Sequence, residues 1–276
     1  MSLISAKIGS ADWNLWPITK NYSKIFHILK KQGIDNVELG IYVPSVELEF
    51  QKQQEILSAS ESSGINITAM LFSLVPSNWP VTAFGNLSSD FLQESKVFLE
   101  TCSSMGVEHA NIWTGVDLPS ADKEQVSRTL LLLDALGSDF DGTISIEYKA
   151  DTVFSTGANL AELLQMTKNL KVLVDTGHAF ALNENVVELI NDLHERGLMG
   201  AMHLGDAISG DSDADLPCGR IHDFAPILEK LKEIEFSKSA NFDLYGAVID
   251  ENGPGPIAIL QESNAYLLDQ ISRLTG

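Results

Sequence analysis

The sequence lacks features that several protein classes require. Its 276 residues include only two cysteines, Cys102 and Cys218, and no spacing pairs them, so we expect free thiols and a reducing compartment. No apolar run reaches about 18 residues, which argues against a membrane span. The first residues lack the basic and apolar segments of a signal peptide. These absences predict a cytoplasmic protein without a membrane partner.

Positive charge is also scarce. Lys and Arg total 18 against 38 Asp and Glu, which gives a formal net charge of −20. A charge of this sign repels phosphate backbones and anionic lipids, so nucleic acid is not an expected partner. A small-molecule substrate is compatible with this charge, and so is a homo-oligomer. The hydrophobic fraction of 44% is typical of a globular protein that folds around a large core.

Short apolar runs rich in β-branched residues alternate with stretches of helical period. The runs recur about every 30 to 40 residues, which is the length of one β/α unit. We predict strands at residues 6–11, 36–42, 65–71, 109–115, 143–149, 171–177, 200–206 and 240–246. Apolar residues at helical spacing predict helices at 91–102, 186–193 and 224–231. Further helices are expected from near Asn21, Glu49, Ser120 and Ala158, and a last one from Pro256 to Leu274.

This alternation of strands and helices predicts a parallel sheet in the α/β class. Many of the strands are apolar on both faces, as a sheet covered on both sides requires. Eight units match a closed (β/α)8 TIM barrel better than an open doubly wound sheet, whose glycine-rich phosphate turn is missing. No linker-like stretch divides the chain, so we predict a single barrel domain over residues 1–276.

The last four predicted strands each end with a carboxylate or an imidazole, at Glu147, Asp175, His203 and Asp243. The carboxyl ends of barrel strands carry the chemistry of the fold. One acidic residue at a strand end is most often a helix N-cap or a member of an ion pair. Three carboxylates and an imidazole at one level, however, would repel one another without a cation. This donor set suits one divalent metal ion, such as Mn²⁺, Mg²⁺, Co²⁺ or Zn²⁺.

Five motifs extend this pattern: V-E-L-G at 37–40, S-I-E-Y-K at 145–149, V-L-V-D-T-G-H-A-F at 172–180, M-H-L-G-D-A at 202–207 and L-P-C-G-R-I-H-D-F-A-P-I-L-E-K-L at 216–231. With them the chain resembles the xylose-isomerase-like TIM barrels over essentially its whole length. That superfamily contains sugar and sugar-phosphate isomerases and epimerases, endonuclease IV, inosose dehydratase and hydroxypyruvate isomerase. The resemblance implies a metal-dependent isomerase or epimerase that acts on a small sugar or sugar phosphate.

The resemblance also implies roles for individual residues. It places the metal ligands at Glu147, Asp175, His203 and Asp243, with the first and last also acting as the catalytic acid/base pair. His178 would contact the substrate. The sequence departs from the family pattern at Asp243, where the family has Glu, and at Lys149, where members often have Asn or His. The loop at 217–220 lacks a second glycine that is often found there.

Other residues near the strand ends have two interpretations each. Glu38 either contacts the substrate or has a structural role. Lys149 and Arg220 either anchor a substrate phosphate or carboxylate, or pair with acids of this acidic chain. Four aromatic residues form either a wall against a sugar face or part of the core: Trp13, Phe72, Trp79 and Trp113.

Three other functions compete with isomerisation. A dehydratase would use the same metal and base but expel a hydroxyl group, and a degenerate barrel would bind sugar without turnover; the sequence leaves both open. A phosphoesterase like endonuclease IV needs additional His ligands on the third and fourth strands. Those strands offer Met70, Phe72, Asn111 and Trp113 instead, and the net charge opposes DNA.

Overall fold

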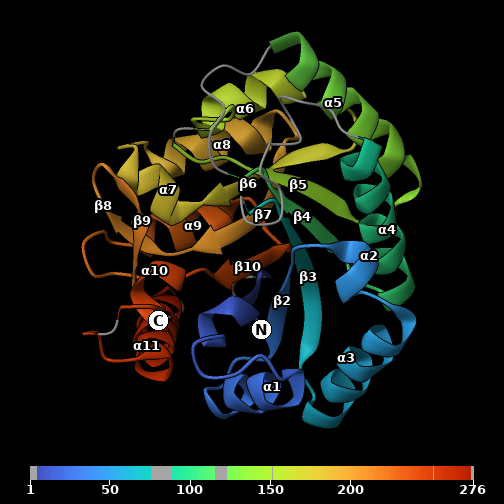
Figure 1. Cartoon of the computed structure of the whole chain (residues 1–276). Helices are drawn as coiled ribbons and strands as arrows, with labels where there is room; N and C mark the ends of the chain where they lie inside the picture. Colours follow the sequence, from blue (N-terminus) through green and yellow to red (C-terminus); the bar gives the residue numbers. More distant parts are fainter. Residues whose placement is uncertain (1–4, 76–88, 116–122, 151, 251, 275–276) are drawn as a thin grey trace.

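The computed structural model describes residues 5–75, 89–115, 123–150, 152–250 and 252–274. Within these residues, eight parallel strands close into a barrel in the order β1-β10-β7-β6-β5-β4-β3-β2, with helices on its outside (Figure 1). The predicted (β/α)8 barrel is therefore confirmed. Its strands are β1 (Lys7–Ala11), β2 (Asn36–Ile41), β3 (Asn66–Ser73), β4 (His109–Trp113), β5 (Thr143–Glu147), β6 (Leu170–Asp175), β7 (Met199–Leu204) and β10 (Ser239–Phe242).

The helices that surround the barrel begin close to the predicted positions. Asn21 caps the first helix by accepting a hydrogen bond from the Lys24 backbone N–H, and Glu49 directly precedes α3. The predicted start at Ser120 lies outside the described residues. The helices are α1 (Tyr22–Lys31), α2 (Pro44–Glu47), α3 (Phe50–Ser63), α4 (Ser89–Met105), α5 (Lys123–Leu136), α6 (Gly157–Leu164), α7 (Thr176–Ala181), α8 (Val186–Glu195), α9 (Ala225–Glu233), α10 (Tyr245–Val248) and α11 (Pro256–Arg273), with 3-10 turns η1 (Asp12–Leu15) and η2 (Gly137–Asp139).

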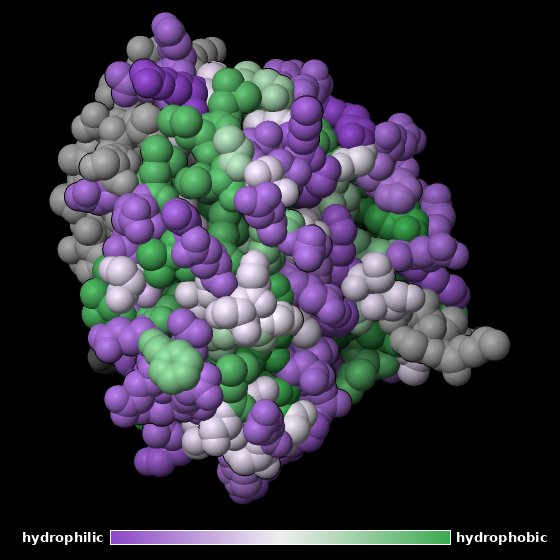
Figure 2. All heavy atoms as spheres, turned by 90° about the vertical axis from the view of Figure 1, so that its right-hand side faces the viewer, coloured by the Kyte–Doolittle hydropathy of each residue, from purple (hydrophilic) through white to green (hydrophobic). Residues whose placement is uncertain are grey.

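The long helices bury one apolar stripe against the barrel. In α8 the predicted stripe of Val186, Leu189, Ile190 and Leu193 is buried, and the stripes of α4 and α9 are buried in the same way. Figure 2 views the side of the molecule that carries α3, α4 and α5, where hydrophilic residues cover much of the outer surface and hydrophobic ones form smaller patches between them. Burial of these stripes is the main force that holds the helices to the sheet. In the described part of the chain, no helix is both long and apolar enough to cross a membrane.

Polar side chains fill one level of the barrel interior. Glu38 on β2, Asn111 on β4, His203 on β7 and Asn241 on β10 are all completely inaccessible to solvent. Asn241 and His203 are register partners on adjacent strands, whereas Glu38 reaches them from across the barrel. Because buried polar groups need partners, this level of the interior forms a hydrogen-bonded network.

A two-stranded antiparallel sheet follows β7 and was not predicted from the sequence. It consists of β8 (Asp206–Ile208) and β9 (Asp211–Leu216), joined by a turn in which Gly210 has a φ of +83°. This hairpin packs against α7 and α10. The predicted strands at 143–149 and 240–246 are too long, because the chain leaves the barrel after Glu147 and Phe242. Beyond these points Lys149, Asp243 and Tyr245 line a pocket, whereas Tyr148 and Leu244 are buried in the core.

Candidate metal centre

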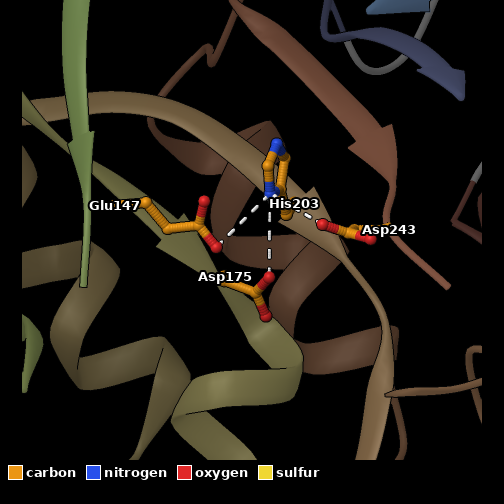
Figure 3. Close-up of side chains that lie close together, drawn as sticks. All are labelled: Glu147, Asp175, His203 and Asp243. Carbon is orange, nitrogen blue, oxygen red and sulfur yellow. Dashed lines mark ion pairs between the residues drawn. The ribbon is translucent and has the colours of Figure 1, made fainter. Parts of the chain in front are cut away.

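The ends of four strands bring the predicted ligand residues together (Figure 3). Glu147 ends β5, Asp175 ends β6, His203 lies on β7 and Asp243 directly follows β10. One potential ligand atom from each residue lies within 4.8 Å of the others. His203 Nδ1 is 3.7 Å from Glu147 Oε1, 3.7 Å from Asp175 Oδ2 and 3.4 Å from Asp243 Oδ2. The shorter Asp243 side chain therefore reaches the cluster without the extra methylene of a Glu.

The orientation of His203 supports a cation at this cluster. Its Nε2 lies 3.0 Å from Glu38 Oε2 and donates to that carboxylate, so Nδ1 faces the cluster and offers a lone pair to a cation once it has released its proton. This Nδ1 and Glu147 Oε2 are both buried and without a hydrogen-bond partner. Buried polar atoms without partners are costly, and a cation between them would satisfy both. The residues thus fit one divalent ion bound by oxygen and nitrogen.

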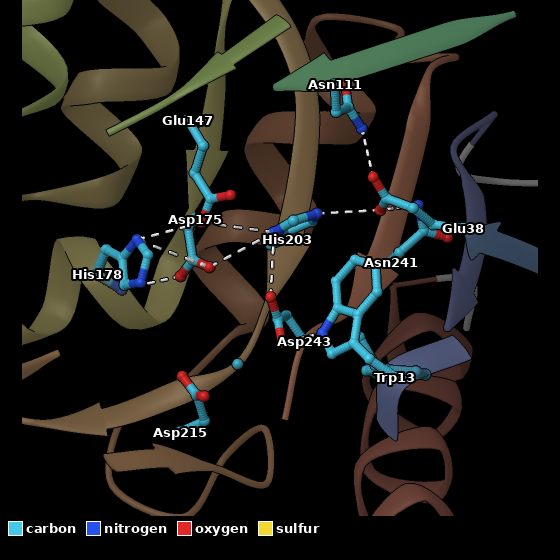
Figure 4. A network of polar contacts seen from close by, with 12 residues as sticks. Trp13, Glu38, Asn111, Glu147, Asp175, His178, His203, Asp215, Asn241 and Asp243 are labelled. Atoms are coloured by element: carbon cyan, nitrogen blue, oxygen red, sulfur yellow. Dashed lines mark hydrogen bonds and ion pairs between the residues drawn. The ribbon is translucent and has the colours of Figure 1, made fainter. Parts of the chain in front are cut away.

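Glu38 lies behind His203 and does not line the pocket. Its Oε2 also accepts a hydrogen bond from Asn241 Nδ2 at 3.0 Å, and its Oε1 accepts one from Asn111 Nδ2 at 2.7 Å (Figure 4). Of the two interpretations open from the sequence, this geometry corresponds to the structural one. A carboxylate that accepts from the second nitrogen of a metal-binding histidine fixes the ring and its tautomer. Asn111 and Asn241 were not predicted as partners of this carboxylate, because no local sequence pattern marks them.

The crowding of charge changes the acidity of the cluster. Burial raises the pKa of Asp243 to about 6, with His203 opposing the shift and Asp175 and Glu147 adding to it. For Asp175 the effect of burial is outweighed by His178 and His203, which lower its pKa to about 2. Burial alone would lower the pKa of His203, but Glu38 and Glu147 raise it well above its usual value. The field at the centre of the cluster therefore favours positive charge.

A pocket of about 230 Å³ lies over the cluster, and Glu147 and Asp243 form part of its wall. Trp13 donates from its indole Nε1 to Asp243 Oδ1 at 2.8 Å, which fixes that carboxylate. Gly40 makes room for this indole, because a Cβ there would lie 2.9 Å from the Trp13 ring. The aromatic residues that line the pocket are Trp13, Trp16, Tyr42, Trp113 and Tyr245.

Two of the four aromatic residues considered from the sequence, Trp13 and Trp113, therefore line the pocket. Phe72 instead belongs to the core, with its ring centroid 6.0 Å from that of Phe91 and 5.6 Å from that of Phe98. Its side chain points from β3 toward α4 and away from the barrel interior. Trp79 lies outside the described residues.

The three candidate substrate contacts have different surroundings. His178 lines the pocket, with its Nδ1 2.9 Å from the Tyr148 carbonyl oxygen and 3.4 Å from Glu147 Oε1. Lys149 also lines the pocket, but it forms an ion pair with Asp213. Arg220 is not among the pocket residues, because its guanidinium group donates to both carboxylate oxygens of Glu262 on α11, at 2.6 and 2.7 Å.

The β8–β9 hairpin supplies acidic pocket residues that were not predicted from the sequence. Asp213 and Asp215 on β9 both line the pocket. Asp215, which is labelled in Figure 4, accepts a hydrogen bond through its Oδ2 from the Gly246 backbone N–H at 2.9 Å. Burial raises the pKa of Asp215 to about 8, and the charges of Asp243 and Asp175 add to the effect. A turn dipeptide at 209–210, followed by acids at every second position from 211 to 215, is the pattern that predicts such a hairpin.

The fold and the cluster define a (β/α)8 barrel with a candidate metal centre at the carboxyl ends of its strands. The chain belongs to the xylose isomerase-like TIM barrel family, whose sequence profile matches residues 21–262. A comparison with the curated proteins gives no match.

Several solved structures share the fold. D-allulose 3-epimerase from Methylomonas sp. superposes with a TM-score of 0.76 at 12% identity, over 97% of this chain and 98% of that chain. The IolI protein with a bound zinc atom superposes with a TM-score of 0.72 at 18% identity, over 97% of this chain and 98% of that chain. The probable 3-DHS dehydratase AsbF from Bacillus anthracis superposes with a TM-score of 0.73 at 14% identity, over 98% of this chain and 99% of that chain. At these identities the likeness concerns the fold alone.

Proposed function

We propose that this protein is a divalent-metal-dependent isomerase or epimerase that acts on a small sugar at the pocket over the cluster. The observation that carries the proposal is the set of four donor atoms within 4.8 Å of one another, which includes a buried imidazole nitrogen without a partner. Glu147, Asp175, His203 and Asp243 would hold one ion, for which Mn²⁺, Mg²⁺, Co²⁺ and Zn²⁺ are the candidates. When bound, the ion would polarise a substrate carbonyl and so acidify the neighbouring C–H bond.

Proton transfer is assigned to Glu147 and Asp243. They belong to β5 and to the residue after β10, so they reach the pocket from different strands. Glu147 would remove the proton next to the carbonyl, and Asp243 would return one on the opposite face, which inverts the carbon centre. Return to the neighbouring carbon would instead interconvert an aldose and a ketose.

His178 and the aromatic residues would position the sugar. The His178 ring is held by the Tyr148 carbonyl oxygen, 2.9 Å from its Nδ1, and lies beside Glu147. Trp13 fixes Asp243 through its indole N–H, and its ring forms part of the pocket wall. Flat apolar rings pack against the C–H face of a sugar, while the polar cluster meets its oxygens.

A dehydratase is the second candidate, and Asp215 is the observation that favours it. Burial raises the pKa of this pocket carboxyl to about 8, so Asp215 holds a proton more tightly than an exposed carboxyl does. A protonated acid beside the substrate can give its proton to a departing hydroxyl group, which then leaves as water. The same metal and the same base would serve both reactions, so the products distinguish them.

The test is solvent-deuterium incorporation into a panel of ketoses by the metal-loaded protein. We expect exchange at the carbon next to the carbonyl in the wild type, and a loss of about 100-fold or more in Glu147→Gln. Gln keeps a carbonyl oxygen for the metal but cannot accept the proton, so metal content should fall much less than exchange. Glu229→Gln, on an exposed position of α9, is the matched control.

Three outcomes would contradict parts of the proposal. Full exchange in Glu147→Gln would reject Glu147 as the base. A product that has lost one water, detected by mass, would replace the isomerase with the dehydratase. Sugar binding by the metal-loaded wild type without any exchange would identify a barrel that binds without catalysis.

A further inference from the structure

The charge of Lys149 is already compensated within the pocket. Its side chain is 11% exposed, and its ammonium group forms an ion pair with the carboxylate of Asp213 on the β8–β9 hairpin. The ammonium also lies over the Trp113 ring, 5.8 Å from its centroid. A cation held by a carboxylate and an aromatic face has little attraction left for a substrate phosphate.

The position of Asp213 is fixed by the packing of its backbone. A Cβ at Gly246 would lie 2.2 Å from the Asp213 carbonyl oxygen, so α10 and the hairpin meet where only a glycine fits. The Asp213 backbone N–H donates to Asp211 Oδ1 at 3.1 Å, and the Gly246 N–H donates to Asp215. The ion pair with Lys149 is therefore built on a supported hairpin.

The rest of the pocket is acidic. Among the described residues that line it, Lys149 is the only Lys or Arg, whereas Glu147, Asp213, Asp215 and Asp243 contribute carboxyl groups. Asp175 adds a further carboxylate to the cluster that Glu147 and Asp243 share. A divalent ion carries two positive charges, one fewer than the number of carboxylates (Glu147, Asp175 and Asp243) in the cluster.

We infer that the pocket takes an uncharged polyhydroxy carbonyl compound and discriminates against its phosphorylated form, with Asp213 as the specificity-determining residue. This inference rests on the proposed function, because it names the substrate class of the same pocket. The volume of about 230 Å³ lies below the range of roughly 300–1,000 Å³ that is usual for drug-sized ligands, and so suits a monosaccharide. The aromatic wall supplies contact without charge.

The test compares matched sugars on the metal-loaded protein: D-fructose with D-fructose 6-phosphate, and D-ribulose with D-ribulose 5-phosphate. We expect the wild type to favour each uncharged sugar by about 100-fold in kcat/KM for deuterium exchange, since like charges without compensation are strongly disfavoured. Asp213→Asn should narrow this ratio by about three- to tenfold. The shift is modest because the Asp213 side chain is 80% exposed and water screens its charge.

Two further variants isolate the ion pair. Asp192→Asn removes the same charge from another acid–base pair, that with Arg196 on the surface of α8, and should leave the ratio unchanged. The single variant Asp213→Asn should raise kcat/KM for phosphorylated sugars, because the Lys149 ammonium is then free to bind phosphate. The double variant Asp213→Asn/Lys149→Met should not show this increase, because it lacks the ammonium.

A binding measurement separates this inference from the proposed function. Inorganic phosphate is titrated into each metal-loaded variant and followed by tryptophan fluorescence, since Trp113 lies beside Lys149. We expect tighter phosphate binding in Asp213→Asn than in the wild type and the double variant. A wild type that prefers the phosphorylated sugars overturns the inference and leaves the isomerase intact. Equal phosphate affinities in all variants overturn the role of Asp213. Absence of exchange with every sugar overturns the proposed function, and the phosphate titration then still decides the role of Asp213.

Discussion

Asp12 offers a test of the electrostatics of the barrel that does not involve the metal ligands. Its side chain is 1% exposed in the turn η1, and its Oδ1 accepts a hydrogen bond from the Gly40 backbone N–H at 3.0 Å. Burial raises its pKa from 3.8 to about 7, the Gly40 hydrogen bond opposes the shift, and the charges of Glu38 and Glu47 add to it. The folded protein therefore holds a proton on Asp12 that the unfolded chain releases at a much lower pH.

The sign of the pH dependence follows from these two pKa values. Between about pH 4 and pH 7 the folded state binds more protons than the unfolded state, so stability falls as the pH rises. The contribution of Asp12 to the free energy of unfolding is fully present below the pKa that Asp12 has in the unfolded chain. It is completely lost above the pKa that Asp12 has in the folded protein. From pH 5 to pH 8, this single group should lower the free energy of unfolding by about 2–3 kcal/mol.

Asp12→Asn removes the titration while keeping the acceptor for Gly40. At pH 5 the folded wild type carries a neutral Asp12, so the variant should match it to within about 1 kcal/mol. At pH 8 the variant should be the more stable by about 2–3 kcal/mol. Urea unfolding at both pH values, with chelator present throughout, measures the difference. The exposed Asp141→Asn is the matched control. If the difference between the wild type and Asp12→Asn did not change with pH, the assigned pKa of Asp12 would be wrong.

The other predictions concern the metal centre. Protein purified without chelator should contain about one equivalent of divalent metal and gain thermal stability from it; His203→Ala should lose both, and a fully loaded His203→Ala protein would exclude the assignment. Glu38→Gln should lower metal affinity by about 10- to 100-fold, measured by chelator competition, because it weakens the partner of the His203 ring; unchanged affinity would reject that role. Asp243→Glu extends the side chain by one C–C bond in a cluster that Asp243 already reaches, so deuterium exchange should fall by about 100-fold at equal metal content. A gain of exchange would instead indicate that the wild-type site has drifted from an active ancestor.

Much of the architecture follows from local patterns. Alternation of β-branched apolar runs with stretches of helical period predicts the eight barrel strands, because each unit must bury one sheet segment under one helix. The ligand cluster follows for the same reason. Parallel strands in a barrel present their carboxyl ends at one face, so polar residues at the ends of β5, β6, β7 and β10 converge. This convergence can be predicted before any side-chain contact is known.

The partners of these residues depend on contacts between distant segments, which carry no local signal. Glu38 meets His203 across the barrel, 165 positions later in the chain, and nothing in V-E-L-G distinguishes an interior carboxylate from one that faces the substrate. Lys149 and Arg220 are both basic residues near strand ends, and no local pattern distinguishes their roles. In the structure Lys149 lies in the pocket beside Asp213, whereas Arg220 pairs with Glu262 on α11. Strand ends place residues at a common level because sheet geometry repeats, whereas the choice of partner depends on how the whole chain closes around them.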